Sequence, residues 1–174
     1  DPFVFEYLAY CSRRLAALPL LGGRSFADAE ESAAEIADTF RAARVPVSYC
    51  HGDFVFRNIH VHDGRVGLID FANTNSRSHL LNDYYNFMFA LDNMVLPGGY
   101  KSALRDALHA GMGDLAFPEV AHRFYYEYHR RRWLMLKLTS GKPLYLLEAC
   151  HGLARFAHPY SSERHGRILP HQQH

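Results

Sequence analysis

The sequence predicts a mostly helical α+β protein in which one short β-hairpin interrupts a series of helices. Apolar residues recur with a helical period before residue 44 and after residue 79, whereas 47–71 contains short β-prone runs. The 174 residues are 48% hydrophobic, which is enough to bury a core. A single domain over 1–174 is therefore expected.

Two helices are expected before the hairpin. Over 2–18, apolar side chains recur at helical spacing, and Pro2 suits a first helical turn. The second helix is expected over 25–44, because Ser25 and Asp28 resemble a capping box and an alanine-rich stretch follows them.

The hairpin is expected within 47–71. The runs NIHVH and RVGLID are separated by Asp63 and Gly64, a residue pair typical of a two-residue hairpin turn. Folding 58–62 back on 66–70 would place Asn58 opposite Asp70 at the open end of the hairpin.

The rest of the chain returns to helical periodicity, which predicts a helical body over 79–157 and a tail over 158–174. Proline at the expected first turns and glycine after an expected last turn support the boundaries. The expected helices are 79–92, 100–111, 118–139 and 143–157.

Three oxygen-bearing side chains should meet at the open end of the hairpin: Asp53, Asn58 and Asp70. Carboxylate and amide oxygens are ligands that suit Mg²⁺ bound together with phosphate and water. Ionised acids at the end of an apolar hairpin would be costly to desolvate, and a bound cation would compensate that cost. The pattern therefore predicts a magnesium–phosphate site.

The stretch HGDFVFRN followed by GLIDF resembles the catalytic and metal-binding motifs of the aminoglycoside phosphotransferase and choline-kinase-like families, relatives of protein kinases. The resemblance implies that Asp53 is the catalytic-loop aspartate that accepts or orients the proton of the substrate hydroxyl, and that Asn58 and Asp70 bind Mg²⁺ and, through it, ATP. Structural support of the loop is implied for three further residues, His51, Gly52 and Asp83.

The resemblance implies the fold of a protein-kinase-like C-terminal lobe and covers roughly residues 1–160. A nucleotide-binding N-terminal lobe with its lysine is expected to be absent, since the first lysine is Lys101. We expect the chain to be a fragment of a larger kinase, or to receive that lobe from a partner chain, and to bind ATP weakly alone.

The implied activity moves the γ-phosphate of ATP to a hydroxyl of a small molecule such as a sugar, an amino alcohol or an aminoglycoside-like compound. Residues 101–174 hold 11 Lys and Arg against 6 Asp and Glu, which favours a neutral or anionic acceptor. Arg57, directly before Asn58, is interpreted either as a phosphate contact or as a solvent-facing arginine.

Two other functions are compatible with the same residues. One is a degenerate kinase lobe that only binds partners. The other is a metal-dependent hydrolase with His51, Asp53 and Asp70 as direct ligands.

No nucleic acid or membrane partner is expected. The basic run at 130–132 is interpreted as a solvated helix face, and no apolar stretch is long enough to span a bilayer. Three widely spaced cysteines suggest a reducing, cytoplasmic location.

Overall fold

The structure, a computed structural model, describes residues 2–17, 29–112, 115 and 117–140. Helices and two small antiparallel sheets make up this part of the chain, which confirms the mostly helical α+β class. The described residues divide into two compact units, one formed by those up to 44 together with 118–140, the other by those within 45–117. The single domain expected over 1–174 stays a prediction.

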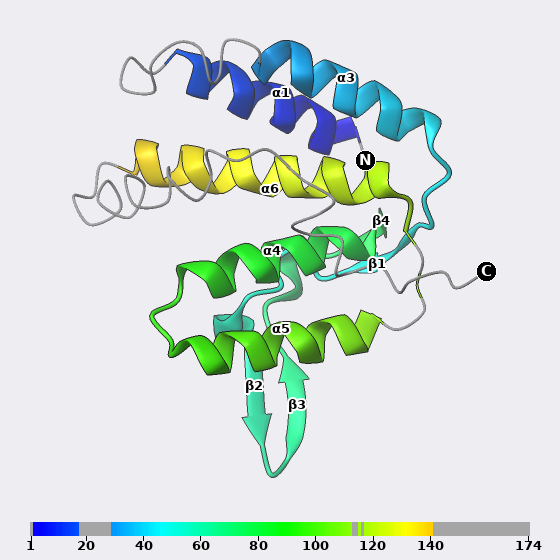
Figure 1. Cartoon of the computed structure of the whole chain (residues 1–174). Coiled ribbons are helices and arrows are strands. Elements are labelled where there is room, and N and C mark those ends of the chain that lie inside the picture. Colours follow the sequence, from blue (N-terminus) through cyan, green and yellow to red (C-terminus); the bar gives the residue numbers. More distant parts are fainter. Residues whose placement is uncertain (1, 18–28, 113–114, 116, 141–174) are drawn as a thin grey trace. The chain divides into compact units, whose positions relative to one another are not determined.

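The first unit contains three helices that all contact one another: α1 (Pro2–Ala16), α3 (Ala29–Ala42) and α6 (Glu119–Thr139) (Figure 1). Small and aliphatic side chains of α1 and α6 are fully buried between them, and the Phe40 ring of α3 stacks on Phe124 of α6 with centroids 4.2 Å apart. Apolar burial of this kind stabilises a helical unit.

Part of the basic run on α6 is buried, so its interpretation as a solvated face was wrong. The side chains of Arg130 and Arg131 are 10% and 2% exposed. Glu127, one turn earlier, accepts a hydrogen bond from Nη2 of Arg130 at 2.6 Å and lies 3.6 Å from Nη2 of Arg131. Glu127 lies three residues before Arg130 and four before Arg131, so its carboxylate compensates the two buried positive charges.

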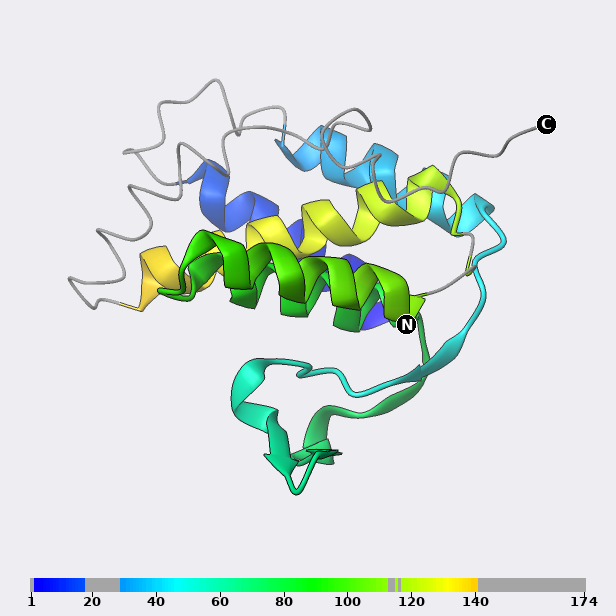
Figure 2. The same cartoon turned by 60° about the horizontal axis from the view of Figure 1, so that its bottom comes forward.

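The second unit begins with β1 (Ser48–Cys50), which pairs with β4 (Asn75–Ser78) in an antiparallel sheet. Strand β4 was not predicted, because its sequence NSRS is polar and lacks β-branched residues. Figure 2 shows that the chain between β1 and α4 is largely irregular and contains only short strands and short helical turns.

The predicted hairpin is present as β2 (Ile59–His62) and β3 (Arg65–Leu68), and it projects from the unit in Figure 1. Asp63 and Gly64 have φ values of 48° and 71°, as the two-residue turn requires. The register differs from expectation by one residue: the Ile69 N–H donates to the Asn58 carbonyl at 3.0 Å. Ile69 rather than Asp70 thus lies opposite Asn58.

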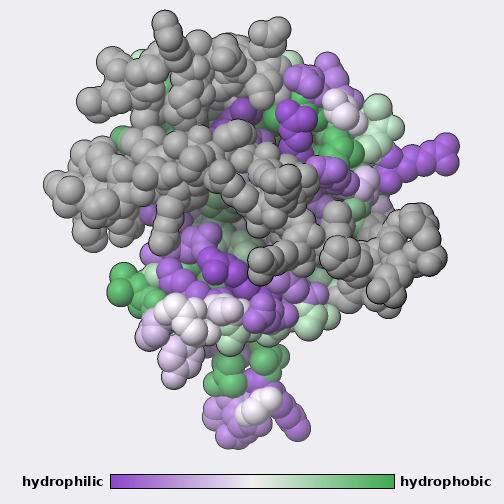
Figure 3. All heavy atoms as spheres, viewed as in Figure 1, coloured by the Kyte–Doolittle hydropathy of each residue, from purple (hydrophilic) through white to green (hydrophobic). Residues whose placement is uncertain are grey.

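The hairpin is exposed. Val61 and Val66 form a cross-strand pair, and each residue is 70% exposed. Figure 3 shows hydrophobic side chains on this projecting element. The sheet therefore does not supply the buried environment assumed for acids at its open end.

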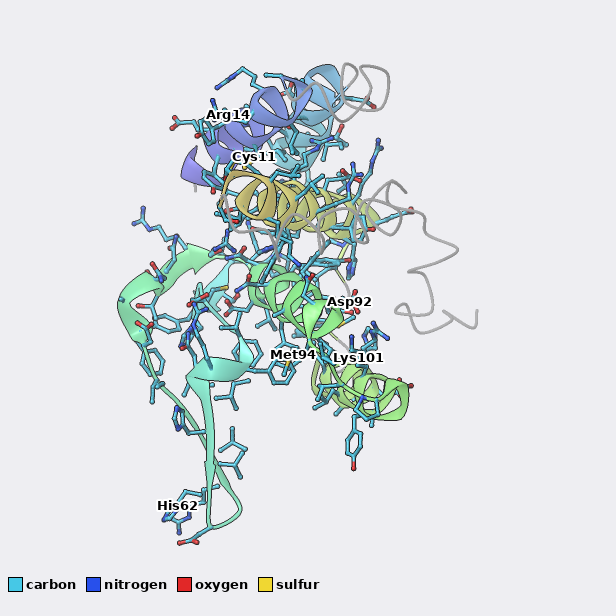
Figure 4. All side chains as sticks on the ribbon, turned by 90° about the vertical axis from the view of Figure 1, so that its left-hand side faces the viewer. Cys11, Arg14, His62, Asp92, Met94 and Lys101 are labelled. Atoms are coloured by element: carbon cyan, nitrogen blue, oxygen red, sulfur yellow. The ribbon has the colours of Figure 1, made fainter. Side chains whose placement is uncertain are left out.

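Two helices complete the unit: α4 (Leu80–Asn93) and α5 (Gly98–Met112). Asp92 joins them, because its carboxylate pairs with Arg105 and its carbonyl accepts a hydrogen bond from Nζ of Lys101 at 3.0 Å. Asp92 and Lys101 lie close together in Figure 4. The helix expected over 143–157 and the tail over 158–174 lie outside the described residues.

Among the described helices, none combines the length and the hydropathy that crossing a membrane requires.

Candidate active site

The candidate site begins in the loop that follows β1, and helix α4 holds this loop. Asp83 lies in the first turn of α4 and is buried. Its Oδ2 accepts a hydrogen bond from the His51 backbone N–H at 2.6 Å, and its Oδ1 accepts one from the Gly52 N–H at 2.8 Å. One carboxylate thus satisfies two consecutive backbone donors of the loop.

Gly52 is required by both conformation and space. Its φ is +79°, in the left-handed region that glycine adopts without strain. A Cβ atom at this position would lie 2.1 Å from the carbonyl oxygen of Asn73. The turn at Gly52 therefore packs directly against the backbone that follows Asp70.

The His51 ring connects the loop to the end of the hairpin. Its Nε2 lies 2.9 Å from the Ile69 carbonyl oxygen, and its Nδ1 accepts a hydrogen bond from the Asp53 backbone N–H at 3.4 Å. This pattern fixes the tautomer, because Nε2 must carry the proton when Nδ1 accepts. Both ring nitrogens are in use, so His51 has none left for a metal.

Asp53 and Asn58 are in direct contact. The Asn58 Nδ2 donates to the Asp53 backbone carbonyl at 2.9 Å and to its Oδ2 at 3.1 Å. Arg57 donates from Nη2 to the same Oδ2 at 2.5 Å. Since the amide nitrogen of Asn58 is turned toward Asp53, its Oδ1 points away from that carboxylate. Asn58 is buried and Arg57 is exposed.

Asp70 lies at the end of the hairpin in the left-handed conformation, with φ 63° and ψ 62°. A non-glycine residue rarely adopts this conformation, and such residues are concentrated at functional sites. Its side chain is exposed and makes no capping hydrogen bond with the turn at 71–73. The desolvation argument made for both acids therefore applies to Asp53, whose side chain is 13% exposed, and not to Asp70.

Burial also shifts the pKa of two groups next to the loop. It raises the pKa of Asp83, against the lowering effect of the hydrogen bonds from His51 and Gly52. Burial likewise raises the pKa of the free thiol of Cys50. Cys50 is 1% exposed, as expected for an inward-packed residue, and a protonated, buried thiol is unsuited to nucleophilic catalysis.

The structure brings five of the six predicted site residues into one hydrogen-bonded network, and Ile69 connects the sixth, Asp70, to it. Ile69 bonds to Asn58 through its N–H and to His51 through its carbonyl. The five are His51, Gly52, Asp53, Asn58 and Asp83.

The side chains near the end of the hairpin that could hold a metal ion offer oxygen, the donor type that Mg²⁺ prefers. Asn58 Oδ1 and the exposed Asp70 carboxylate are hard oxygen donors. Within residues 2–17, 29–112, 115 and 117–140, no group of three or more His, Cys, Asp or Glu side chains is arranged to hold a metal. The hydrolase alternative needs His51 as a ligand, and both of its nitrogens are already bonded.

Sequence reasoning missed the ion pair between Arg57 and Asp53 and the contact between Gly52 and Asn73. The ion pair had no helical signal, because an i,i+4 spacing brings opposite charges together on an α-helix, and the segment from Asp53 to Arg57 is not α-helical. The contact between Gly52 and Asn73 had no sequence signal, since it depends on a turn after Asp70 that the residue types do not specify.

The decisive comparison is with protein families. The sequence model of the phosphotransferase enzyme family (APH) matches residues 3–110, more than half of the chain. The chain belongs to the phosphotransferase enzyme family. The matched span of this APH member contains every site residue from His51 to Asp83, and the resemblance identified from HGDFVFRN and GLIDF is confirmed. Searches of curated proteins and of solved structures gave no match.

Proposed function

We propose that this member of the phosphotransferase enzyme family transfers the γ-phosphate of ATP to a hydroxyl group of a small molecule. The observation that carries the proposal is the contact between Asp53 and Asn58 on a loop whose backbone is held by Asp83. Phosphoryl transfer depends mainly on positioning and charge neutralisation, and a loop whose carboxylate is held in place supplies the positioning.

Asp53 is the proposed general base. Its Oδ2 is occupied by Asn58 and Arg57, and its Oδ1 accepts no hydrogen bond from the described residues. Oδ1 would take the proton of the acceptor hydroxyl as the hydroxyl oxygen bonds to the γ-phosphorus and the bond to the β–γ bridging oxygen breaks, releasing ADP.

Asn58 and Asp70 are the residues proposed to hold Mg²⁺. The Asn58 amide is buried, and its oxygen is turned away from Asp53. The Asp70 carboxylate at the end of the hairpin is exposed. One amide oxygen and one exposed carboxylate suit an ion that keeps several waters. When bound, the ion would neutralise phosphate charge.

We propose that a nucleotide-binding lobe packs on the exposed hairpin. Val61 and Val66 expose apolar surface on the element that ends at Asp70. We propose that this chain forms a protein-kinase-like C-terminal lobe. Its nucleotide-binding lobe would come from a longer chain or from another protein. The acceptor is proposed to be a hydroxyl compound of the sugar, amino alcohol or aminoglycoside-like classes.

A paramagnetic ion tests the metal site without requiring turnover. Mn²⁺ with ATP should broaden the NMR signals of the Asn58 side-chain amide and the Asp70 backbone before others. Asp70→Asn should abolish this selectivity. Asp63→Asn, at the exposed hairpin tip, should preserve it, since the Asp63 side chain is 85% exposed and pairs only with His62. Broadening at Asp63 equal to that at Asn58 and Asp70, or selective broadening that survives Asp70→Asn, would contradict the proposal.

A further inference from the structure

We propose that Arg57 binds an anionic group of the acceptor, so that the substrate is a hydroxyl compound carrying a carboxylate or phosphate close to the phosphorylated hydroxyl. The inference rests on the proposed function and adds the chemical class of its acceptor. It comes from the ion pair between Arg57 and Asp53, which the family motif does not require.

The geometry leaves most of the guanidinium available. Arg57 uses Nη2 to hold Oδ2 of Asp53 at 2.5 Å, while its side chain is 73% exposed. Its Nη1 and Nε make no hydrogen bond with the described residues. Guanidinium has five N–H donors in a planar fork, so one edge can hold the base while another binds an anion.

The position of Arg57 also fixes where the anion would sit. Arg57 and Asn58 hold the same carboxylate oxygen, and this leaves Oδ1 of Asp53 for the hydroxyl. An acceptor whose anionic oxygens reach Nη1 or Nε would present a neighbouring hydroxyl to Oδ1. We therefore expect an acceptor with its hydroxyl and its acid group on adjacent or nearby carbons.

Charge discriminates between acceptors. A cationic acceptor would approach a guanidinium beside the base, and like charges in a partly desolvated site repel. An anionic acceptor would gain a charge-assisted and potentially bidentate contact. Proton transfer from the hydroxyl to Oδ1 of Asp53 stays open, because Arg57 donates its hydrogen bond to the other carboxylate oxygen, Oδ2.

A matched set of three-carbon probes tests the proposal by binding alone. Glycerate and glycerol 3-phosphate carry an anion, glycerol is neutral, and 3-amino-1,2-propanediol is cationic. The Arg57 Nε–Hε signal should shift saturably with either anionic probe and not with the neutral or cationic ones. A response to only one anion identifies carboxylate or phosphate as the recognised group.

The controls separate this inference from the proposed function. Arg57→Gln should weaken anion binding, read from the backbone amide of Asn58, by roughly tenfold or more, and Arg57→Lys should retain part of it. Arg41, a comparably exposed arginine paired with Asp38 at 2.8 Å, should not respond. Equal shifts at Arg41 and Arg57, or no saturable shift with either anion, would overturn the proposal. Selective Mn²⁺ broadening at Asn58 and Asp70 would stand in either case.

Discussion

The Asp83 carboxylate holds the backbone of His51 across 32 residues of sequence, with 2.6 Å between Oδ2 and the amide nitrogen. Its second oxygen holds Gly52, so the loop is attached to α4 by two hydrogen bonds from one side chain. The loop that carries Asp53 thus depends on a residue that makes no hydrogen bond to Asp53 itself.

Asp83→Asn should loosen this attachment. Asparagine has one acceptor oxygen, so one of the two N–H groups would face an NH₂ group and lose its partner. A buried unsatisfied donor costs about 1–3 kcal/mol, and the amide protons of His51 and Gly52 should exchange about tenfold faster or more.

Asp92→Asn is the matched control for this exchange measurement. Asp92 is a carboxylate on the same helix that pairs with Arg105 and does not contact the loop. Unchanged exchange at His51 and Gly52 in Asp83→Asn would show that the loop is held by other contacts.

Gly52→Ala and Gly64→Ala separate conformational strain from steric conflict. Both glycines have positive φ, +79° and +71°, but only Gly52 has a backbone oxygen where Cβ would lie. Gly64→Ala should cost about 1–2 kcal/mol for the left-handed conformation, and Gly52→Ala about 3 kcal/mol or more in urea unfolding. Equal losses would mean that Asn73 moves aside freely.

The sequence predicted those parts of the fold that local chemistry determines. Asp63 and Gly64 specify a two-residue turn, and the turn was found where it was expected. A two-residue turn pairs His62 with Arg65 and therefore Asn58 with Ile69, so the expected pairing of Asn58 with Asp70 did not follow the register that this turn fixes.

Contacts between distant segments set the limit of sequence reasoning. Strand β4 is polar and is defined only by its pairing with β1, which local propensity does not encode. From the sequence, Arg130 and Arg131 are expected at the surface; in the structure both are buried and lie close to Glu127. The family was easier to predict, because HGDFVFRN and GLIDF place particular residue types at fixed spacings; the catalytic and metal-binding roles of these residues stay predictions.

Asp53→Asn should abolish most of the phosphoryl transfer while preserving nucleotide binding. A general base contributes roughly 10²–10⁴-fold, which corresponds to about 3–5 kcal/mol of barrier. Asparagine keeps the shape and can still contact Asn58, so Mn²⁺ broadening at Asn58 should persist. Transfer measured with γ-labelled ATP in wild type and Asp53→Asn checks this, with Asp63→Asn as a variant of unchanged rate. A variant with wild-type turnover would remove Asp53 from the role of base.

His109 should make the contact between α4 and α5 sensitive to acid. Its ring lies on α5, half-buried, with Nδ1 3.1 Å from the Tyr84 hydroxyl oxygen on α4. Burial lowers the His109 pKa, while Asp106 raises it and Arg105 lowers it. The folded state therefore prefers neutral imidazole more strongly than the unfolded chain does.

The sign of the pH dependence follows from this lowered pKa. The stabilisation is fully present above the unfolded-state value of about 6.5 and is lost as the pH falls below it, because the unfolded chain takes up a proton first. Wild type should therefore lose stability relative to His109→Gln when urea unfolding is compared at about pH 7.5 and about pH 5.5. His62→Gln, whose side chain is 92% exposed, should not reproduce this relative change. If wild type instead became more stable relative to His109→Gln in acid, His109 would be stabilised in its charged form.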